Sequence, residues 1–464
     1  MPIKFLTMRN RIYLLALLSI LFFNSCQKDE ITNTEVSPPA SEYSHRIALT
    51  WNQLFLEMER FTPGYRPPIS ARSNGYINLI AYEAIVHGSE GKYKSLAKSY
   101  YNIAIDPPKV GESYNWEVAL NAAYQRAFEL FFPTAPSEQQ FLALQIGSDL
   151  RSELQSQVPV DVFSRSALYG RSIAASIYDW SAKDQWGHVA YLHNNDPGYI
   201  PPSGAGFWQP TYPDYLAPLL PNWGKVRTFA PINSVSAPPP PAYLVNQSSQ
   251  LYSEANEVMT IVNKIKSGEN HDDLWIAQFW SDDCPILTFT PAGRWISIAN
   301  QIVPIFRPNM METVALYAKL GMALSDAGVK SWEQKFKYNL MRPIDYIRQN
   351  MGNPNWNTLM CPDGSEGYYT PNFPAYPSGH ATFAAAASVV LEEFVGPSYR
   401  MTDRSHEGRT EFIGKPRTFN SIRDMAIENA HSRIPLGVHF RVDSNVGLNI
   451  GYAIGEKVLG LPWN

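Results

Sequence analysis

Residues 373–387 read FPAYPSGHATFAAAA, a proline-rich loop that runs directly into alanines. Alanine is the best helix former, so the run predicts a helix that begins near Pro377, Ser378 and Gly379. A helix N-terminus leaves backbone N–H groups unpaired and carries the positive end of the helix dipole, which favours an anion. Ser378 adds a hydroxyl group, Gly379 allows close backbone approach, and His380 titrates near neutral pH. The stretch therefore predicts a helix and half of an oxyanion site.

Most of the remaining sequence is also helical in pattern. Before the middle of the chain, apolar residues recur at helical spacing in residues 69–88, 115–133, 137–157 and 169–184. Residues 197–244 are instead dense in proline, glycine and aromatic residues, which predicts an extended segment laid across helices, because its aromatic rings need burial. Helices resume near Ser248, and no stretch alternates as a strand does. We expect an all-α protein with two helical halves joined by this segment.

Composition excludes several classes of protein. The chain has 464 residues, of which 45% are hydrophobic and 17% charged, as in a globular protein with one to three domains. Its formal net charge is −4, so we expect no nucleic-acid partner. The sequence contains neither a zinc-binding pattern nor a phosphate-binding glycine-rich loop.

The N-terminus has the pattern of an export signal. Basic residues precede the apolar run Ile12–Phe23, which is too short to span a bilayer, and Cys26 follows it. The pattern resembles a bacterial lipoprotein signal over residues 1–26, followed by a flexible tether at 27–43. We expect an outer-membrane or cell-surface lipoprotein that contacts the membrane only through its lipid; a plain secretory signal, giving a periplasmic or secreted protein, is the alternative.

Two further cysteines, Cys284 and Cys361, allow two interpretations. They could form one disulfide in an oxidising compartment, or they could be two separate buried thiols. The sequence alone leaves both open.

An oxyanion site also needs fixed cations, and residues 335–343 offer two of them. Lys335 and Arg342 are seven residues apart, close to two helical turns, so both would project from one helix face before Pro343. Such a pair in isolation is usually a solvent-exposed helix face.

A third fragment supplies Arg433, His439 and Asp443. Pro435 and Gly437 predict a loop that would let Arg433 turn toward the same site. His439 and Asp443 are four apart, on one helical face, where the carboxylate would fix the imidazole tautomer and leave one ring nitrogen free.

Together the three fragments resemble the signature of the superfamily of type 2 phosphatidic acid phosphatases and vanadium haloperoxidases. Every signature position is matched, at Lys335, Arg342, Pro343, Pro377, Ser378, Gly379, His380, Ser432, Arg433, His439 and Asp443. A chance match of that many specified residues at fixed spacing falls below roughly one in a million.

The soluble branch of this superfamily resembles the chain best. The lipid phosphatases have several spanning helices, whereas no apolar run after the signal is long enough to span a bilayer. Similarity to the vanadium haloperoxidases covers about residues 65–455, and the N-terminus and length suit the bacterial iodoperoxidases. This resemblance implies two helical bundles packed side by side, with an N-terminal half at 44–240 and a C-terminal half at 241–464 that carries the site.

The resemblance also implies roles for individual residues. Vanadate, or phosphate in its place, would be held by Lys335, Arg342, Ser378, Gly379, His380, Arg433 and His439. His439 would be the vanadium ligand and Asp443 its support. His380 would accept a proton from hydrogen peroxide, and Lys335 would polarise the peroxide for attack by halide. Trp332, Phe373 and Asp283 match positions around the pocket, and Asp283 would pair with a vanadate-binding arginine.

Three functions remain to be separated. A haloperoxidase would oxidise iodide, or less readily bromide, and the product could halogenate small organic acceptors. A secreted acid phosphatase would use His439 as a nucleophile that forms phosphohistidine, with His380 protonating the leaving alcohol. A non-catalytic binding protein would not need both histidines. The same residues serve both reactions, and we expect the peroxidase.

Overall fold

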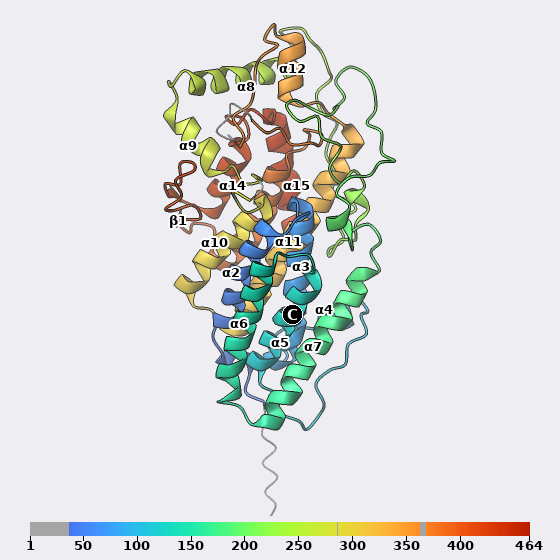
Figure 1. Cartoon of the computed structure of the whole chain (residues 1–464), viewed down its shortest axis with the longest axis vertical. Helices are drawn as coiled ribbons and strands as arrows, with labels where there is room; N and C mark the ends of the chain where they lie inside the picture. The colour runs from blue at the N-terminus through green and yellow to red at the C-terminus, as the bar shows by residue number, and fades with distance from the viewer. Residues whose placement is uncertain (1–36, 285, 362–367) are drawn as a thin grey trace, which may run out of the picture.

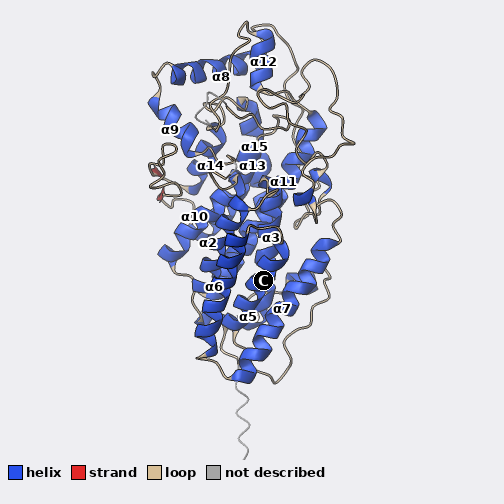
Figure 2. Ribbon diagram, in the orientation of Figure 1, coloured by secondary structure: helices blue, strands red, loops and turns tan. Residues whose placement is uncertain are grey.

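Nearly all regular structure in the chain is helical (Figure 2). The computed structural model describes residues 37–284, 286–361 and 368–464. The N-terminal half contains α2 (Arg46–Phe61), α3 (Pro67–Ile85), α4 (Leu96–Ser99), α5 (Trp116–Phe131), α6 (Ser137–Gln155) and α7 (Val160–Ala182). The C-terminal half contains α8 (Gln250–Lys266), α9 (His271–Phe279), α10 (Pro291–Phe306), α11 (Met310–Tyr338), α12 (Pro343–Asn350), α13 (Gly379–Val395), α14 (Ile422–His431) and α15 (Arg441–Leu459). Short 3-10 helices are η1 (Ala40–Glu42), η2 (Val86–Ser89), η3 (Ala190–Leu192) and η4 (Trp223–Lys225). The prediction of an all-α fold is confirmed.

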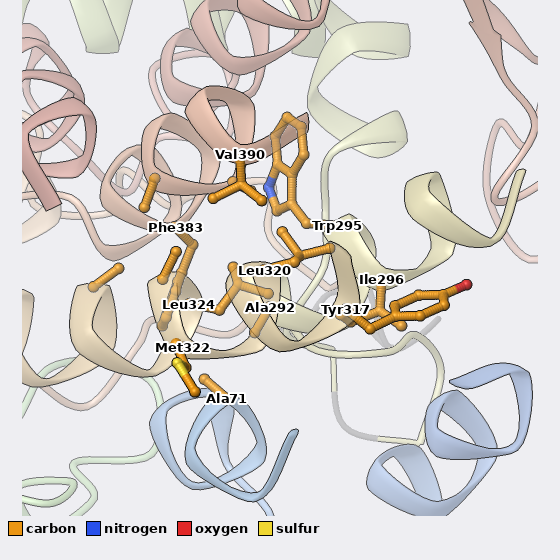
Figure 3. Packing of buried hydrophobic residues seen from close by; sticks show 14 of the residues in the cluster. Ala71, Ala292, Trp295, Ile296, Tyr317, Leu320, Met322, Leu324, Phe383 and Val390 are labelled. Atoms are coloured by element: carbon orange, nitrogen blue, oxygen red, sulfur yellow. The ribbon is translucent and has the colours of Figure 1, made fainter. Parts of the chain in front are cut away.

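Helix α11 of the C-terminal half packs against α3 of the N-terminal half, near the middle of the molecule (Figure 1). It begins with a capping box, in which Asn309 and Glu312 each accept a hydrogen bond from the other's backbone N–H. Most of its residues are buried, so apolar side chains occur all around it rather than on one stripe. Figure 3 shows Leu320, Met322 and Leu324 of α11 among side chains from α3, α10 and α13. One large hydrophobic core therefore includes residues from both halves.

Residues 197–244, the Pro-rich segment, cross these helices in extended form. Apart from η4, no helix or strand occurs in this segment. Its Trp208 and Trp223 are fully buried. The backbone N–H groups of residues 229–230 donate to the Asp326 carboxylate of α11, over 2.8 and 2.7 Å. The prediction that this segment lies across helices and buries its aromatic residues is confirmed.

Helices α13 and α15 approach so closely that their backbones are in contact. Three glycines of α15 make this approach: Gly447, Gly451 and Gly455. A Cβ on Gly447 would lie 2.7 Å from the Ser378 carbonyl oxygen, and one on Gly451 would lie 2.3 Å from that of Thr382. The Ser378 N–H also donates to the Asp443 carbonyl over 2.9 Å. These contacts fix the start of α13 against the start of α15.

A small antiparallel hairpin was not predicted. Strands β1 (Met401–Asp403) and β2 (Arg417–Phe419) pair in this way between α13 and α14. Each strand has three residues, too few to produce a recognisable alternation of apolar and polar positions.

The predicted tether at residues 27–43 extends too far toward the C-terminus. Ser37 Oγ accepts a hydrogen bond from Tyr114 N over 2.6 Å, and Tyr43 O accepts one from Met310 N over 2.8 Å. Residues 37–43 are therefore packed on the helices. The predicted signal at 1–26 and the start of the tether lie outside the described residues.

Two further observations concern the helices and the cysteines. In the parts of the chain that the structure describes, no helix has the length and apolar character needed to cross a bilayer. Cys284 and Cys361 form a disulfide, which decides between the two interpretations that the sequence left open.

Candidate active site

Helix α13 begins at the predicted oxyanion site. Ser378 is its N-cap, and Ser378 Oγ accepts a hydrogen bond from Ala381 N over 3.4 Å. Pro377 therefore lies just before the helix rather than in its first turn. The N–H groups of Gly379 and His380 begin the helix and have no acceptor among the described residues. Two backbone donors are thus available at this end of α13.

Lys335 and Arg342 come from two different elements, so the prediction of one shared helix face is wrong. Helix α11 ends at Tyr338, and Asn339, with φ of 50°, turns the chain out of the helix. Arg342 has an extended conformation just before α12, because a residue that precedes proline disfavours the α region. The two side chains nevertheless bind the same segment.

That segment is residues 373–375, which lead into α13. Lys335 Nζ donates to the carbonyl oxygens of Pro374 and Ala375, over 2.9 and 3.0 Å. Arg342 Nε donates to the Phe373 carbonyl oxygen over 2.9 Å. Both cations are fully buried, and neither forms an ion pair with a carboxylate within the described residues. Neutral carbonyls do not cancel this positive charge, and the Asp443 carboxylate opposes the effect of burial on both cations from beyond ion-pair distance.

His439 and Asp443 form the predicted pair at the start of α15, which begins at Arg441. His439 therefore lies before the helix, and the two residues do not share a face within it. His439 Nδ1 lies 2.9 Å from Asp443 Oδ2, and Arg342 Nη1 donates to His439 Nε2 over 3.2 Å. The proton is accordingly on Nδ1, and Nε2 carries a lone pair. Burial raises the pKa of Asp443 to about 7, and the charges of Lys335 and Arg342 oppose that shift.

Arg433, in the turn between α14 and α15, is the third buried cation. Its Nη1 donates to the Trp280 carbonyl oxygen over 3.0 Å, and its Nη2 lies 3.6 Å from Met360 Sδ. Arg433 Nε is buried without a hydrogen-bond partner in the described chain. Like the other two cations, it has no carboxylate within ion-pair distance there.

Burial is the main cause of the shifted pKa values at the site, and repulsion between like charges adds to it. Both effects lower the pKa of Lys335 well below its usual range. Burial lowers the pKa of Arg342 and of Arg433 to about 10. It also lowers the pKa of His380 and of His439 well below the usual range, with neighbouring cations adding to the shift. A bound anion would oppose all of these shifts.

The donor set fits a tetrahedral oxyanion. Buried atoms without hydrogen-bond partners in the described chain include Arg342 Nη2, Arg433 Nε, Ser331 Oγ and Asp443 Oδ1. Most of these atoms are hydrogen-bond donors, and two belong to cations. The described residues contain no group of three or more histidine, cysteine, aspartate or glutamate side chains that could hold a metal cation. The site therefore suits an anion.

Trp332 and Phe373 form an apolar wall beside the cations. Their ring centroids are 4.8 Å apart, and Trp332 Nε1 donates to the Leu219 carbonyl oxygen over 3.2 Å. The Phe373 centroid lies 5.1 Å from Lys335 Nζ and 4.9 Å from Arg342 Cζ. The aromatic faces stabilise the cations without neutralising them.

Asp283 lies near the site, but its ion pair is with Arg66, at 3.5 Å. In the described chain it forms no ion pair with Arg342 or Arg433, so the implied pairing is absent. Arg66 Nη2 also donates to Tyr369 Oη over 3.1 Å. Burial raises the pKa of Asp283, and the charges of these three arginines oppose the shift. The sequence reasoning missed Arg66, which is far from the signature and has no marker beyond the prolines that follow it.

A buried charged network holds His380, and no sequence pattern predicted it. His380 Nε2 donates to the Asp282 carbonyl oxygen over 2.9 Å, which leaves a lone pair on Nδ1. The Asp282 carboxylate binds Arg294 at 2.9 Å and His406 at 3.2 Å. Arg294 also binds Asp403 at 3.0 Å. Asp282 and Arg294 are more than a hundred residues before Asp403 and His406, so no local pattern could have revealed the network.

A cavity of about 240 Å³ is lined in part by Arg66 and Asp283. Its walls include Arg60, Phe61, Tyr65, Arg66, Asp283, Ile286 and Phe289. The Ile286 side chain is largely exposed, so the cavity opens toward solvent. It combines two arginines with apolar surface next to the residues that border the oxyanion site.

The C-terminal half of the chain matches a known family model. Residues 315–461 match a family model described as the VCPO second helical-bundle domain. This range contains the whole signature from Lys335 to Asp443.

Two curated relatives are similar in sequence. Vanadium chloroperoxidase of Curvularia inaequalis is 26% identical over 508 aligned positions, covering 88% of this chain and 81% of that protein. Vanadium-dependent bromoperoxidase of Ascophyllum nodosum is 34% identical over 130 positions, covering 26% of this chain and 23% of that protein.

Solved structures are similar over nearly the whole chain. The crystal structure of the first bacterial vanadium-dependent iodoperoxidase has a TM-score of 0.76 and 28% identity, covering 90% of this chain and 96% of that one. A holo-type bacterial vanadium-dependent chloroperoxidase has a TM-score of 0.61 and 14% identity, covering 86% and 92%. The second similarity concerns the fold alone.

Proposed function

The chain belongs to the vanadium haloperoxidase family, and on that premise we propose that it oxidises iodide, in preference to bromide, with hydrogen peroxide to the hypohalous acid. One observation carries the proposal. Three fully buried cations without carboxylate partners in the described chain surround the start of α13 and α15: Lys335, Arg342 and Arg433. An arrangement of this kind is costly unless an anion completes it.

Vanadate fits this donor set in shape and charge, and phosphate would fit in the same way. The residues that would hold it are Lys335, Arg342, Ser378, Gly379, His380 and Arg433, with His439 as the ligand to vanadium. When bound, vanadate supplies a Lewis acid that activates hydrogen peroxide while keeping its own oxidation state.

His439 and Asp443 prepare the ligand atom. The bond from His439 Nδ1 to Asp443 Oδ2 holds the tautomer in which Nε2 has its lone pair free. Arg342 donates to Nε2 in the present structure and would need to give up that bond to an incoming ligand. Burial and the neighbouring cations lower the pKa of His439, which favours the neutral imidazole that a metal ligand needs.

His380 would handle the proton of hydrogen peroxide. Its Nε2 proton is bound to the Asp282 carbonyl, so Nδ1 is the atom available to accept another proton. Lys335 would supply positive charge beside the peroxide, in a position fixed by two carbonyl oxygens.

The preference for iodide rests on two supports. Iodide is the easiest of the common halides to oxidise, so a site of modest oxidising power accepts it first. The solved bacterial iodoperoxidase is 28% identical to this chain, whereas the bacterial chloroperoxidase is 14% identical. Fungal chloroperoxidases share both wall aromatics, so Trp332 and Phe373 do not by themselves define the halide.

The test is steady-state turnover of purified protein with orthovanadate, using iodide, bromide and chloride at fixed hydrogen peroxide. We expect iodide to be fastest and chloride to give little or no turnover. A phosphate ester serves as the second arm, because the same residues could act through phosphohistidine. Hydrolysis of the ester without oxidation of any halide would indicate that the protein is a phosphatase. Equal turnover of chloride and iodide would contradict the proposed preference for iodide.

We also propose that the protein is exported. The Cys284–Cys361 disulfide supports an oxidising compartment, where such bonds form and persist. Lipidation at Cys26 remains our proposal from the sequence, and metabolic labelling with a fatty-acid analogue, compared between wild type and Cys26→Ser, tests it.

A further inference from the structure

The Cys284–Cys361 disulfide joins two segments that are 77 residues apart in the chain and that both contact the site. One is residues 280–284, which follow α9. The other is residues 358–361, which follow α12. We propose that this disulfide positions Arg433, so that breaking it weakens oxyanion binding while the protein stays folded. The inference rests on the proposed function only in taking the site to bind an oxyanion.

Arg433 contacts one residue in each of these two segments. Trp280, four residues before Cys284, accepts from Arg433 Nη1 over 3.0 Å. Met360, directly before Cys361, places its Sδ 3.6 Å from Arg433 Nη2. These are the only side-chain hydrogen bonds that Arg433 makes in the described chain. The disulfide therefore links the two segments that hold Arg433, one through Trp280 and the other through Met360. We call these two contacts the Arg433 clamp.

The two acceptors of Arg433, a carbonyl oxygen and a thioether sulfur, are neutral, so they bind the guanidinium more weakly than a carboxylate would. A carboxylate would hold the guanidinium strongly but would also cancel its charge. A carbonyl oxygen and a thioether sulfur leave the charge available to an anion but bind it weakly, sulfur most of all. A clamp of this kind depends on its two sides being fixed by something else.

The segment at 280–284 also positions His380. Its Asp282 carbonyl oxygen accepts the His380 Nε2 proton over 2.9 Å. The Asp282 carboxylate is itself bound to the fully buried Arg294. Cys284 also keeps its backbone hydrogen bonds with Thr288, over 3.2 and 3.0 Å. We therefore expect loss of the disulfide to uncouple this segment from residues 358–361 without unfolding it.

The other segment also keeps its anchors. Leu359 N donates to Leu436 O over 2.9 Å, and Met360 O accepts from Tyr369 N over 2.9 Å. These bonds do not include Cys361, so they persist when the disulfide is broken. Met360 would stay nearby but would no longer be tied to the Trp280 side.

The experiment uses the full chain and measures the dissociation constant of orthophosphate by calorimetry. Dithiothreitol breaks the S–S bond, giving two protein thiols while its own two thiols become a cyclic disulfide. Phosphate is the probe in this arm because thiols reduce vanadate. Orthovanadate is measured without reductant, on the Cys284→Ser/Cys361→Ser variant. We expect binding of each anion to weaken about tenfold, as when a supporting partner of a bound group is lost.

Arg433→Lys shows whether the effect passes through Arg433. Lysine keeps the charge but has a single amino group, which cannot reach both acceptors as the two guanidinium nitrogens do. Reduction of the disulfide should therefore change the phosphate affinity of this variant by less than about twofold. Thermal unfolding and near-UV circular dichroism establish that each form is folded. If Arg433→Lys does not fold, Met360→Leu replaces it; that variant removes the sulfur acceptor at similar volume and should be less sensitive to reduction than wild type.

The outcomes separate the two hypotheses. Equal weakening in wild type and in Arg433→Lys would overturn the positioning role and leave a general structural one. Unchanged phosphate affinity in folded, reduced wild type would also overturn it. Failure of the oxidised wild type to bind either anion would instead contradict the proposed function.

Discussion

At the level of single atoms, the site depends on which nitrogen of His439 carries the proton. The Asp443 carboxylate fixes the proton on Nδ1, and Arg342 occupies Nε2 with a hydrogen bond. Phosphate and vanadate would therefore meet the same cations, but only vanadium would bond to the freed nitrogen. This difference gives a way to separate a ligand from a charged neighbour.

His439→Ala should abolish vanadate-dependent turnover and sharply weaken vanadate binding, while phosphate affinity changes by no more than a few fold. The reason is that the three cations remain, whereas the nitrogen that we propose as the vanadium ligand is lost. Titration of each anion into the purified variant measures the two affinities. Parallel losses for both anions would show that His439 acts through charge and shape instead.

Asp443→Asn is the matched comparison for this experiment. The amide keeps the shape of the side chain but can present its nitrogen to His439 and disturb the tautomer. We expect vanadate affinity to fall by roughly 10–100-fold, as for other residues that support a metal ligand. A larger loss of vanadate affinity in Asp443→Asn than in His439→Ala would contradict the proposal that His439 is the ligand and Asp443 its support.

The cavity beside Arg66 and Asp283 supports a prediction about halide access. Ile286→Glu should raise the apparent KM for iodide and Ile286→Lys should lower it, with kcat unchanged. A unit charge about 10 Å away in water contributes about 0.4 kcal/mol, so each shift should be roughly twofold. Steady-state kinetics at two ionic strengths measures both, and the shifts should shrink at the higher one.

Val160 provides the control, because it is 75% exposed at the start of α7 and does not line this cavity. Val160→Glu and Val160→Lys should leave the KM for iodide unchanged. Equal effects at Val160 and Ile286 would indicate a response to net charge and not a route through the cavity.

At the level of elements, the sequence predicted the helices better than the geometry of the site. Helix periodicity and alanine content were enough to predict α3, α5, α6 and α13, because these signals are local. The shared face of Lys335 and Arg342 was wrong, because Asn339 ends α11 and Pro343 imposes an extended Arg342. The signature spacing identified residues that meet, but it could not say from which elements they come.

The support of the site was missed for a different reason. Arg294 and Asp403 bind each other from α10 and β1, and Arg66 binds Asp283 from the start of α3. Such pairs are defined only by tertiary contact between distant segments. No pattern in one stretch of sequence distinguishes them from charges on the surface.

The contact between α11 and the Pro-rich segment makes stability depend on pH. Burial raises the pKa of Asp326 from 3.8 to about 7, against two backbone hydrogen bonds that favour the carboxylate. Between these values the folded chain keeps a proton that the unfolded chain has lost. The contribution of Asp326 to stability should therefore fall as pH rises from about 4 to 7 and stay level above that.

Asp326→Asn tests this prediction, because asparagine does not titrate. Denaturant unfolding at several pH values gives the free energy of unfolding for both proteins. The advantage of wild type over the variant should be greater at pH 4 than at pH 8, by at most about 4 kcal/mol. A difference that does not change with pH would mean that Asp326 is ionised throughout.

At the level of the whole molecule, the two helical halves share one core. Side chains of α3 from the N-terminal half and of α10 and α13 from the C-terminal half pack around α11 (Figure 3). The halves were distinguished in the sequence by the Pro-rich segment between them. Neither half buries its apolar surface without the other.

The protein should consequently unfold in one cooperative transition. Separate expression of residues 241–464 should give a chain that lacks a sharp thermal transition, because α11 would expose the surface that α3 covers. Differential scanning calorimetry of both chains checks this. Two resolved transitions in the full protein, or a sharp one in the fragment, would refute the single-core interpretation.

The glycines of α15 set a limit on how this protein could be engineered. Replacing helix glycines with alanine is a common way to raise thermostability, since it reduces the entropy of the unfolded chain. At Gly447 and Gly451 the added methyl group would collide with carbonyl oxygens of α13. The displaced helix would carry Ser378, Gly379 and His380 away from the cations that face them. Substitutions to alanine at Gly447 or Gly451, chosen for helix propensity alone, would therefore reduce activity. Variants selected for both heat resistance and activity should keep glycine at these two positions.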